Sequence, residues 1–110
     1  MWTPITLTEL NKLIKQEEFD SSVTQLWELI KIEPEKWEET EFGNEGGFWA
    51  VAIFGKNVIW YNDIEEGFNI SPYKIYGKID YYYCNQDELK HVLMNLHSHK
   101  FFKRNGAEGL

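Results

Sequence analysis

The sequence is poor in cysteine and in long apolar runs. Its 110 residues include one cysteine, Cys84, so no disulfide can form within the chain. Proteins of oxidising compartments usually carry paired cysteines, and we therefore expect a cytoplasmic protein. The first residues also lack the basic and then apolar pattern of a secretory signal. The longest apolar run, residues 48–54, has seven residues against the roughly 20 that cross a bilayer, so no membrane span is predicted.

Positive charge is also scarce. Lysine and arginine number 11 against 18 Asp and Glu, which gives a net charge of −7 with neutral histidines. The charges of residues 1–30 sum to −3, those of residues 31–70 to −6 and those of residues 71–110 to +2. Such a surface repels phosphate groups, so binding to nucleic acid or to an anionic membrane is not expected.

Large aromatic side chains are abundant, with five Trp, six Tyr and seven Phe. Together with 43% hydrophobic residues they supply a core and exclude intrinsic disorder as the state of the chain. The length fits one globular domain, which we place at residues 1–104, with residues 105–110 as a frayed tail.

Two helices are predicted in the first third of the chain. Residues 6–18 carry leucines at helical spacing, and Thr6 with Glu9 has the form of a capping box. A second helix follows Asp20 with the same apolar spacing, and it must end before Pro34, which would remove a helical hydrogen bond.

An antiparallel meander is predicted next. Residues 48–54 and 58–61 are β-rich and are separated by Gly-Lys-Asn, which is typical of a hairpin. A short strand is expected at residues 68–70, and the strict alternation of residues 75–84 predicts a further principal strand that ends in a buried Cys84 thiol. Residues 37–40 fit either a short edge strand or an irregular segment.

A last helix is expected to begin at Asn85 as its N-cap, with a buried stripe of Leu89, Val92, Leu93 and Leu96. The predicted fold class is therefore α+β, with two N-terminal helices, an antiparallel β-meander of about three to five strands and one C-terminal helix. The first strand of the hairpin is apolar on both faces, so both faces of the sheet must be covered, by the helices or by a partner.

Acidic residues gather in what we call the acidic band: Glu33, Glu35, Glu38, Glu39, Glu41 and Glu45, with Asp63, Glu65 and Glu66 on a later loop. A negative surface of this kind speeds encounter with a basic protein, and an aromatic residue within it has the character of an interface anchor. The predicted protein interface is Trp37, Glu38, Glu39, Glu41, Asp63, Glu65 and Glu66. The alternatives are a solvated surface that serves only solubility and, for Trp37, a place in the core.

The Asp63–Glu66 loop allows a second interpretation, a small-ligand site or a hydrolase. Paired carboxylates suit acid–base chemistry, and a pocket in which Asp63, Glu65 and a histidine converge would indicate an enzyme. Oxygen-rich loops also bind calcium, but the loop lacks the ligand spacing of an EF-hand, and no metal or cofactor is expected. His91 and His97 do not share a helical face with each other. No catalytic residue is therefore predicted.

The stretch from Gly46-Gly47-Phe48-Trp49 to Phe68-Asn69-Ile70-Ser71 resembles small uncharacterised bacterial proteins, and it covers about a quarter of the chain. In size and charge the whole chain is similar to the immunity proteins of bacterial toxin systems. That resemblance implies a non-enzymatic protein that neutralises a basic toxin, and it carries over no site residue. A homodimer built on an exposed aromatic face of the sheet is a further alternative.

Overall fold

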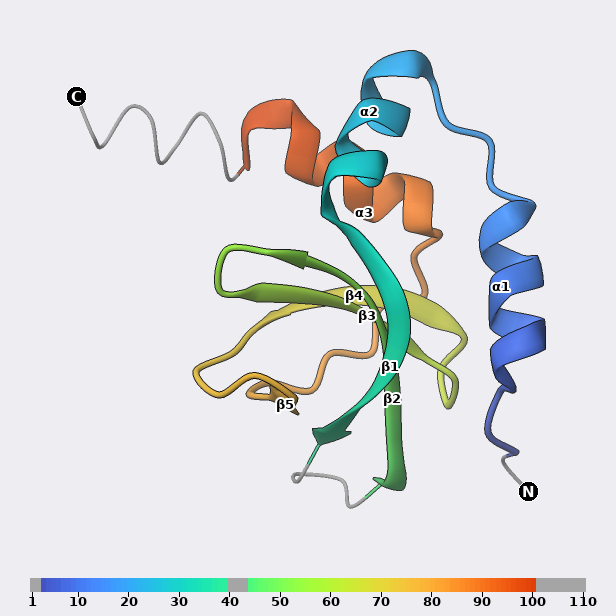
Figure 1. Ribbon diagram of the computed structural model, residues 1–110, viewed down its shortest axis with the longest axis vertical. Helices are drawn as coiled ribbons and strands as arrows, with labels where there is room; N and C mark the ends of the chain where they lie inside the picture. The colour runs from blue at the N-terminus through green and yellow to red at the C-terminus, as the bar shows by residue number, and fades with distance from the viewer. Residues whose placement is uncertain (1–2, 40–43, 101–110) are drawn as a thin grey trace.

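The structure, a computed structural model, describes residues 3–39 and 44–100 (Figure 1). The predicted frayed tail and Glu41 lie outside these residues. Two N-terminal helices, a five-stranded sheet and a C-terminal helix follow one another, so the predicted α+β class is confirmed. Among the described residues, none of the helices has the length and apolar character needed to cross a bilayer.

Helix α1 spans Leu7–Lys15 and begins at the predicted capping box. The backbone N–H of Glu9 donates to Thr6 Oγ1 over 3.1 Å, and the N–H of Thr6 donates to Glu9 Oε1 over 3.0 Å. These bonds satisfy donors that a helix start otherwise leaves open. The helix is shorter than the predicted 6–18, because Gln16 already serves as its C-cap.

Helix α2 spans Ser21–Ile30, and the Asp20 carboxylate caps it by accepting from the N–H of Val23 over 2.9 Å. Its C-cap, Lys31, has extended backbone angles, so the chain passes directly into strand β1, Lys31–Glu39. The expectation for residues 37–40 was therefore too modest. Residues 37–39 end a nine-residue strand that lies between two others, whereas residue 40 lies outside the described residues, and the strand includes Pro34 where its pairing register shifts.

Strands β2 (Asn44–Phe54), β3 (Asn57–Asn62) and β4 (Gly67–Pro72) continue the meander, and the predicted hairpin and short strand are confirmed. All three are antiparallel to their neighbours, and the sheet order is β4-β3-β2-β1-β5. The tight turn between β2 and β3 uses Gly55 at φ 59°, a value that glycine reaches without strain.

The predicted principal strand at residues 75–84 is wrong. Only β5, Lys78–Ile79, pairs with the sheet, and it runs parallel to β1. The alternating side chains do not form one buried face, since Ile75 is 60% and Tyr76 59% exposed. We call residues 73–88 the strap, because they cross beneath the sheet on the way from β4 to the last helix (Figure 1).

Side chains of β4 hold the strap in place. Ser71 Oγ donates to the carbonyl of Tyr81 over 2.8 Å, and Asn69 Oδ1 accepts from the N–H of Asn85 over 3.0 Å. The strap needs no long backbone ladder, since the sheet supplies these partners from its own face. Cys84 lies exposed on the strap, so the expectation of a buried thiol at a strand end is wrong.

Helix α3, Leu89–Asn95, continues into the π-helical turn η1, Leu96–Lys100. Its N-cap is Glu88, which makes no side-chain capping bond, so the prediction of Asn85 as N-cap is wrong. Asn85 is instead held by Asn69 before the helix begins. The predicted apolar stripe is confirmed, and all four of its members are buried: Leu89, Val92, Leu93 and Leu96.

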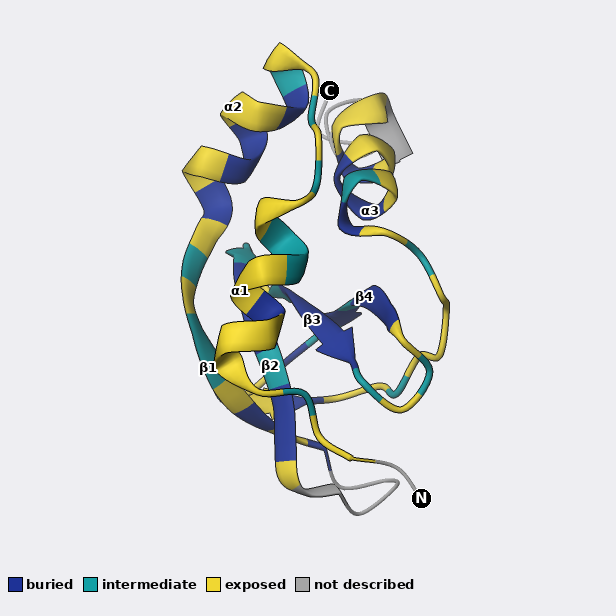
Figure 2. Cartoon of the chain, turned by 90° about the vertical axis from the view of Figure 1, so that its right-hand side faces the viewer, coloured by how far each residue is buried: buried dark blue, intermediate teal, exposed yellow. Residues whose placement is uncertain are grey.

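Both faces of the sheet are covered, as predicted for its central strands. The helix-side core lies between the three helices and one face of the sheet, whereas the strap-side core lies between the other face and the strap. Figure 2 shows β3 as an almost unbroken buried strand between these layers. On β2 the register shifts between Ala50 and Ala52, and consequently Val51 and Ala52 both face the helix-side core.

Candidate functional site

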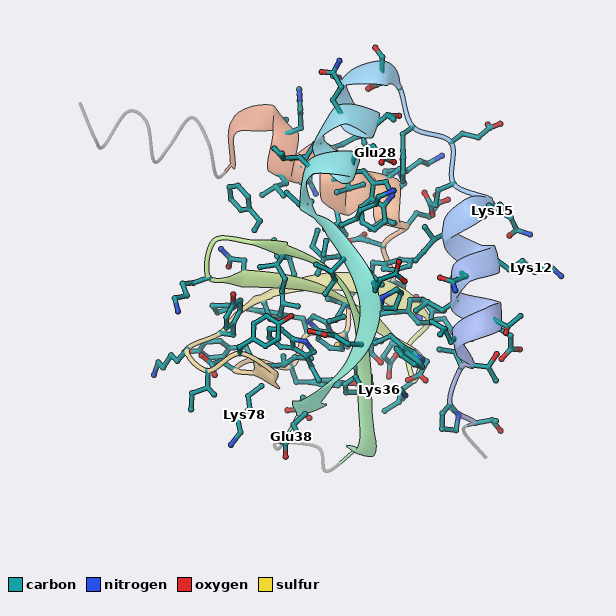
Figure 3. The ribbon with its side chains drawn as sticks, viewed as in Figure 1. Lys12, Lys15, Glu28, Lys36, Glu38 and Lys78 are labelled. Carbon is teal, nitrogen blue, oxygen red and sulfur yellow. The ribbon has the colours of Figure 1, made fainter. Side chains whose placement is uncertain are left out.

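The structure divides the acidic band rather than gathering it. Trp37 is 1% and Glu39 3% exposed, so neither side chain reaches a surface that a partner could contact. Glu38 is exposed at the far end of β1, where it lies opposite Lys78 of β5 (Figure 3). Of the remaining predicted interface residues, Glu41 lies outside the described residues, whereas Asp63, Glu65 and Glu66 lie together on the turn between β3 and β4.

This turn is fixed by a buried asparagine. Asn62 is fully buried, and its Oδ1 accepts from the N–H of Ile64 over 3.0 Å and from that of Glu65 over 3.1 Å. Its Nδ2 donates to the carbonyl of Tyr83 on the strap over 3.0 Å. Glu66 has φ 59°, an uncommon value for a residue with a side chain. The carboxylates therefore stand on a backbone that the core holds in one conformation.

The N-terminal segment is attached to the same turn. The N–H of Ile5 donates to Asp63 Oδ2 over 2.8 Å, although the two residues are 58 positions apart. Trp49 Nε1 donates to the carbonyl of Ile5 over 3.1 Å. Glu9 follows one turn later, with its carboxylate held by the capping box. The start of α1 is thus brought beside the β3–β4 turn.

An open cavity of about 420 Å³ lies between these two segments, and we call it the acidic hollow. Its size is within the roughly 300–1,000 Å³ of pockets that receive ligands. Three carboxylic acids line it, Glu9 from α1 and Asp63 with Glu66 from the turn. The other lining residues are Thr3, Pro4, Ile5, Tyr61 and Ile64, so none of its described lining residues is basic.

The acids of the hollow have different protonation behaviour. Burial raises the pKa of Asp63, and this effect exceeds the lowering by the hydrogen bond from Ile5 and by the charge of Lys36. The capping bonds from Thr6 lower the pKa of Glu9, which therefore stays ionised. Burial also raises the pKa of Tyr61, with added effects of the Glu66 and Asp63 charges, so its phenol stays neutral and can donate a hydrogen bond.

The lining can be compared with the set of residues that the sequence analysis required for an enzyme. Neither Glu65 nor a histidine is among the described residues that line the hollow, so the set that would indicate a hydrolase is not assembled there. Within the described ranges, no three His, Cys, Asp or Glu side chains are placed to hold a metal ion. What remains is an open, negatively charged hollow with an apolar rim, where Ile64 is 39% exposed.

Of the predicted interface residues, Asp63 and Glu66 line the hollow, whereas Glu65 lies on the same turn but does not line it. Two lining residues, Glu9 and Tyr61, were missed by sequence reasoning. The capping box marked Glu9 only as a helix residue, and Tyr61 was recognised on a strand beside the acidic loop but was given no role in a site. No local pattern links Glu9 to the turn, because only the fold brings it there, whereas Tyr61, on β3, stands two residues before Asp63.

No family model matches the chain, and neither the search of curated proteins nor the search of solved structures finds a match.

Proposed function

We propose that this chain is a non-enzymatic protein-binding domain whose acidic hollow receives a basic segment of a partner protein. One observation carries the proposal: carboxylic acids from two distant segments, Glu9 on α1 and Asp63 with Glu66 on the β3–β4 turn, line one open cavity. Charge of one sign on a fixed backbone steers a partner of opposite sign and restricts its orientation. An immunity protein that neutralises a basic toxin is the biological role that fits this chemistry.

The rim of the hollow supports contact with a protein rather than with a free ion. Ile64 exposes an apolar side chain beside the acids, and Ile5 lies partly buried within the lining. Interfaces commonly combine an apolar contact with a charged or polar rim. A lysine or arginine side chain matches this combination, since its aliphatic stem packs on apolar surface while its charge meets the carboxylates.

The test uses two matched charge reversals on one turn. Glu66→Lys changes a residue that lines the hollow, whereas Glu65→Lys makes the same change on a neighbour that does not line it. Each variant and the wild-type protein are used to capture partners from the native cytoplasm, and the affinity for a captured protein is measured at several salt concentrations. We expect Glu66→Lys to lower the affinity at least about tenfold, and added salt to weaken wild-type binding.

Equal loss in both variants would show that general charge, and not the hollow, attracts the partner. Affinity that is unchanged by salt and by Glu66→Lys would reject the proposal.

A further inference from the structure

The outer edge of β4 is a second surface of interest, and the cavity beside it shares no described lining residue with the acidic hollow. Strand β4 is the last strand of the sheet order, so its outer backbone groups have no neighbouring strand. Its pairing with β3 is regular from Asn57↔Pro72 to Asn62↔Gly67. In a regular antiparallel pair, residues point their N–H and C=O alternately toward the partner strand and away from it. The outward residues of β4 can therefore be identified.

Two hydrogen bonds to the strap fix this alternation. The N–H of Phe68 donates to the carbonyl of Asp87 over 2.8 Å, and the carbonyl of Pro72 accepts from the N–H of Asp80 over 3.3 Å. The backbone groups of Phe68 and Pro72 thus point away from β3, and those of Ile70, midway between them, point away from β3 as well. In the described part of the chain, no hydrogen-bond partner occurs for the N–H or the C=O of Ile70.

The strap is hydrogen-bonded to β4 at Phe68 and at Pro72, and it leaves a gap beside Ile70 between these two points. A cavity of about 210 Å³ lies there, between β4, the strap and α3. Ile70 and Phe68 line it from the strand, Tyr83 and Asp87 from the strap, and Val92 and Asn95 from α3. Asp87 is the one charged residue among its described lining residues. Asn69 and Asn85 also line it, so the groove combines an open backbone pair, walls of apolar and amide side chains, and one negative charge.

We propose that this groove binds one residue of an extended peptide from another protein through a single β-bridge to Ile70. The free N–H and C=O of Ile70 stand on either side of its Cα atom and point in the same direction. Another amino-acid residue, whose own N–H and C=O are arranged in the same way, can form a hydrogen bond with each of them. A lone amide cannot do so, since its N–H and C=O point in opposite directions. The strap occupies the positions on either side, so the peptide crosses the edge instead of extending the sheet.

Charge selects among peptide residues. Asp87 favours a bound lysine or arginine, and Tyr83, which is 43% exposed, offers an aromatic face beside it. The Asp87 carboxylate repels a peptide that carries an acidic residue at this position. Binding at this groove does not involve the acidic hollow, so the proposal for the groove can be tested independently of the proposed function.

The probe for the test is N-acetyl-lysine N-methylamide, which is one residue with both flanking amides. It is titrated into the isotope-labelled full chain and followed by NMR, together with hydrogen exchange of backbone amides. We expect the Ile70 amide to exchange rapidly in the free protein and to shift and become protected as the probe is added. Affinity in the millimolar range is sufficient, because two hydrogen bonds contribute little net binding energy.

Matched probes and variants separate the parts of the proposal. Methylation of the α-nitrogen of the lysine removes one bridging donor without altering the protein, and it should weaken binding about tenfold. Ile70→Pro removes the outward N–H at an edge where proline is tolerated, whereas Ile70→Val keeps it and should bind as the wild type does. Asp87→Asn should abolish the preference for the lysine probe over the corresponding glutamate probe.

Several results would overturn the proposal. One is an Ile70 amide that is already protected in the free protein, including protection that rises with protein concentration and so indicates a second copy at the edge. Another is a methylated probe that binds as well as the parent probe. The third is a set of shifts that leaves Ile70 and its groove unchanged.

Discussion

The indole Nε1 of Trp60 donates to Ser71 Oγ over 2.9 Å in the strap-side core, where both residues are fully buried. The same oxygen donates its hydrogen to the carbonyl of Tyr81, so one hydroxyl links β3, β4 and the strap. A buried donor or acceptor that loses its partner costs the free energy of its lost hydration. This single serine therefore contributes to stability out of proportion to its size.

Replacement of this hydroxyl tests the link. We expect Ser71→Ala to lower the free energy of unfolding by about 1–3 kcal/mol, because it leaves the Trp60 indole and the Tyr81 carbonyl without a partner. Urea denaturation measures the loss. Ser98→Ala makes the same chemical change at an exposed position and should stay within about 0.5 kcal/mol of the wild type. Equal effects of the two changes would contradict the role of the link.

At Gly67 the backbone of the strap lies close against β4. A Cβ atom there would lie 2.2 Å from the carbonyl oxygen of Asn85 and 2.4 Å from Gln86 Cα, both of which are backbone atoms. Gly67→Ala must therefore displace the strap, and we expect a loss of about 3 kcal/mol in the free energy of unfolding. Gly55→Ala meets no atom within 4 Å and carries only the cost of φ 59°, about 1 kcal/mol. Similar losses in both variants, measured by denaturation, would contradict this ranking.

Trp37 provides a test of core against surface. It is 1% exposed, and its ring packs edge-on against Tyr73 at a centroid distance of 5.0 Å. We expect Trp37→Ala to lower the free energy of unfolding by about 3–5 kcal/mol, as for other buried aromatic residues. Leu29→Ala removes an apolar side chain that is 82% exposed and should change stability by about 0.5 kcal/mol or less. A folded Trp37→Ala protein of normal stability would contradict the buried placement.

The raised pKa of Asp63 predicts a pH dependence of stability. Because burial raises this pKa in the folded protein, the folded chain keeps the Asp63 proton at pH values where the unfolded chain has lost it. The resulting stabilisation is complete below the unfolded pKa and is lost as the pH rises through the folded pKa. Asp63→Asn stays neutral and still offers an acceptor to Ile5. We expect this variant to gain stability relative to the wild type as the pH rises from the unfolded pKa through the raised folded pKa.

The stability contributed by Asp20 should depend on pH in the opposite direction. The N–H of Val23 lowers its folded pKa, so its contribution to stability is present above the unfolded pKa and is lost as the pH falls through the folded pKa. Asp20→Asn keeps a capping oxygen without that dependence, and its disadvantage against the wild type should shrink on acidification. Unfolding curves of both variants over the same pH series provide the measurement. If the stability difference from the wild type changed with pH in the same direction for both variants, the predicted pKa directions would be contradicted.

The parts of the fold that depend on near neighbours were predictable. Thr6 with Glu9 and the Asp20 cap mark helix starts through bonds that span three residues, and the hairpin turn at Gly55 is equally local. Strand β1 was underestimated, because its glutamates and Pro34 disfavour a strand when read alone. Its pairing with β2 and the burial of Trp37 outweigh that local preference.

The strap misled the sequence analysis for a different reason. Alternating tyrosines are typical of a strand, but the partners of this segment are side chains of β4, among them Asn69 and Ser71, and no sequence pattern reveals such partners. The acidic hollow was foreseen only in its Asp63 and Glu66 half. Its other half depends on the hydrogen bond between Ile5 and Asp63, which joins two segments that are 58 positions apart in the chain.

The position of α3 after the sheet also affects synthesis. Leu89, Leu93 and Leu96 complete the helix-side core, and they leave the ribosome after every strand of the sheet has emerged. At about 5–20 residues per second, the apolar face of β2 and β3 therefore waits for seconds before its last covering helix arrives. Among the described helices, α1 and α2 can shield it during that interval, and we expect the nascent chain to have its greatest need of a chaperone just before α3 is made.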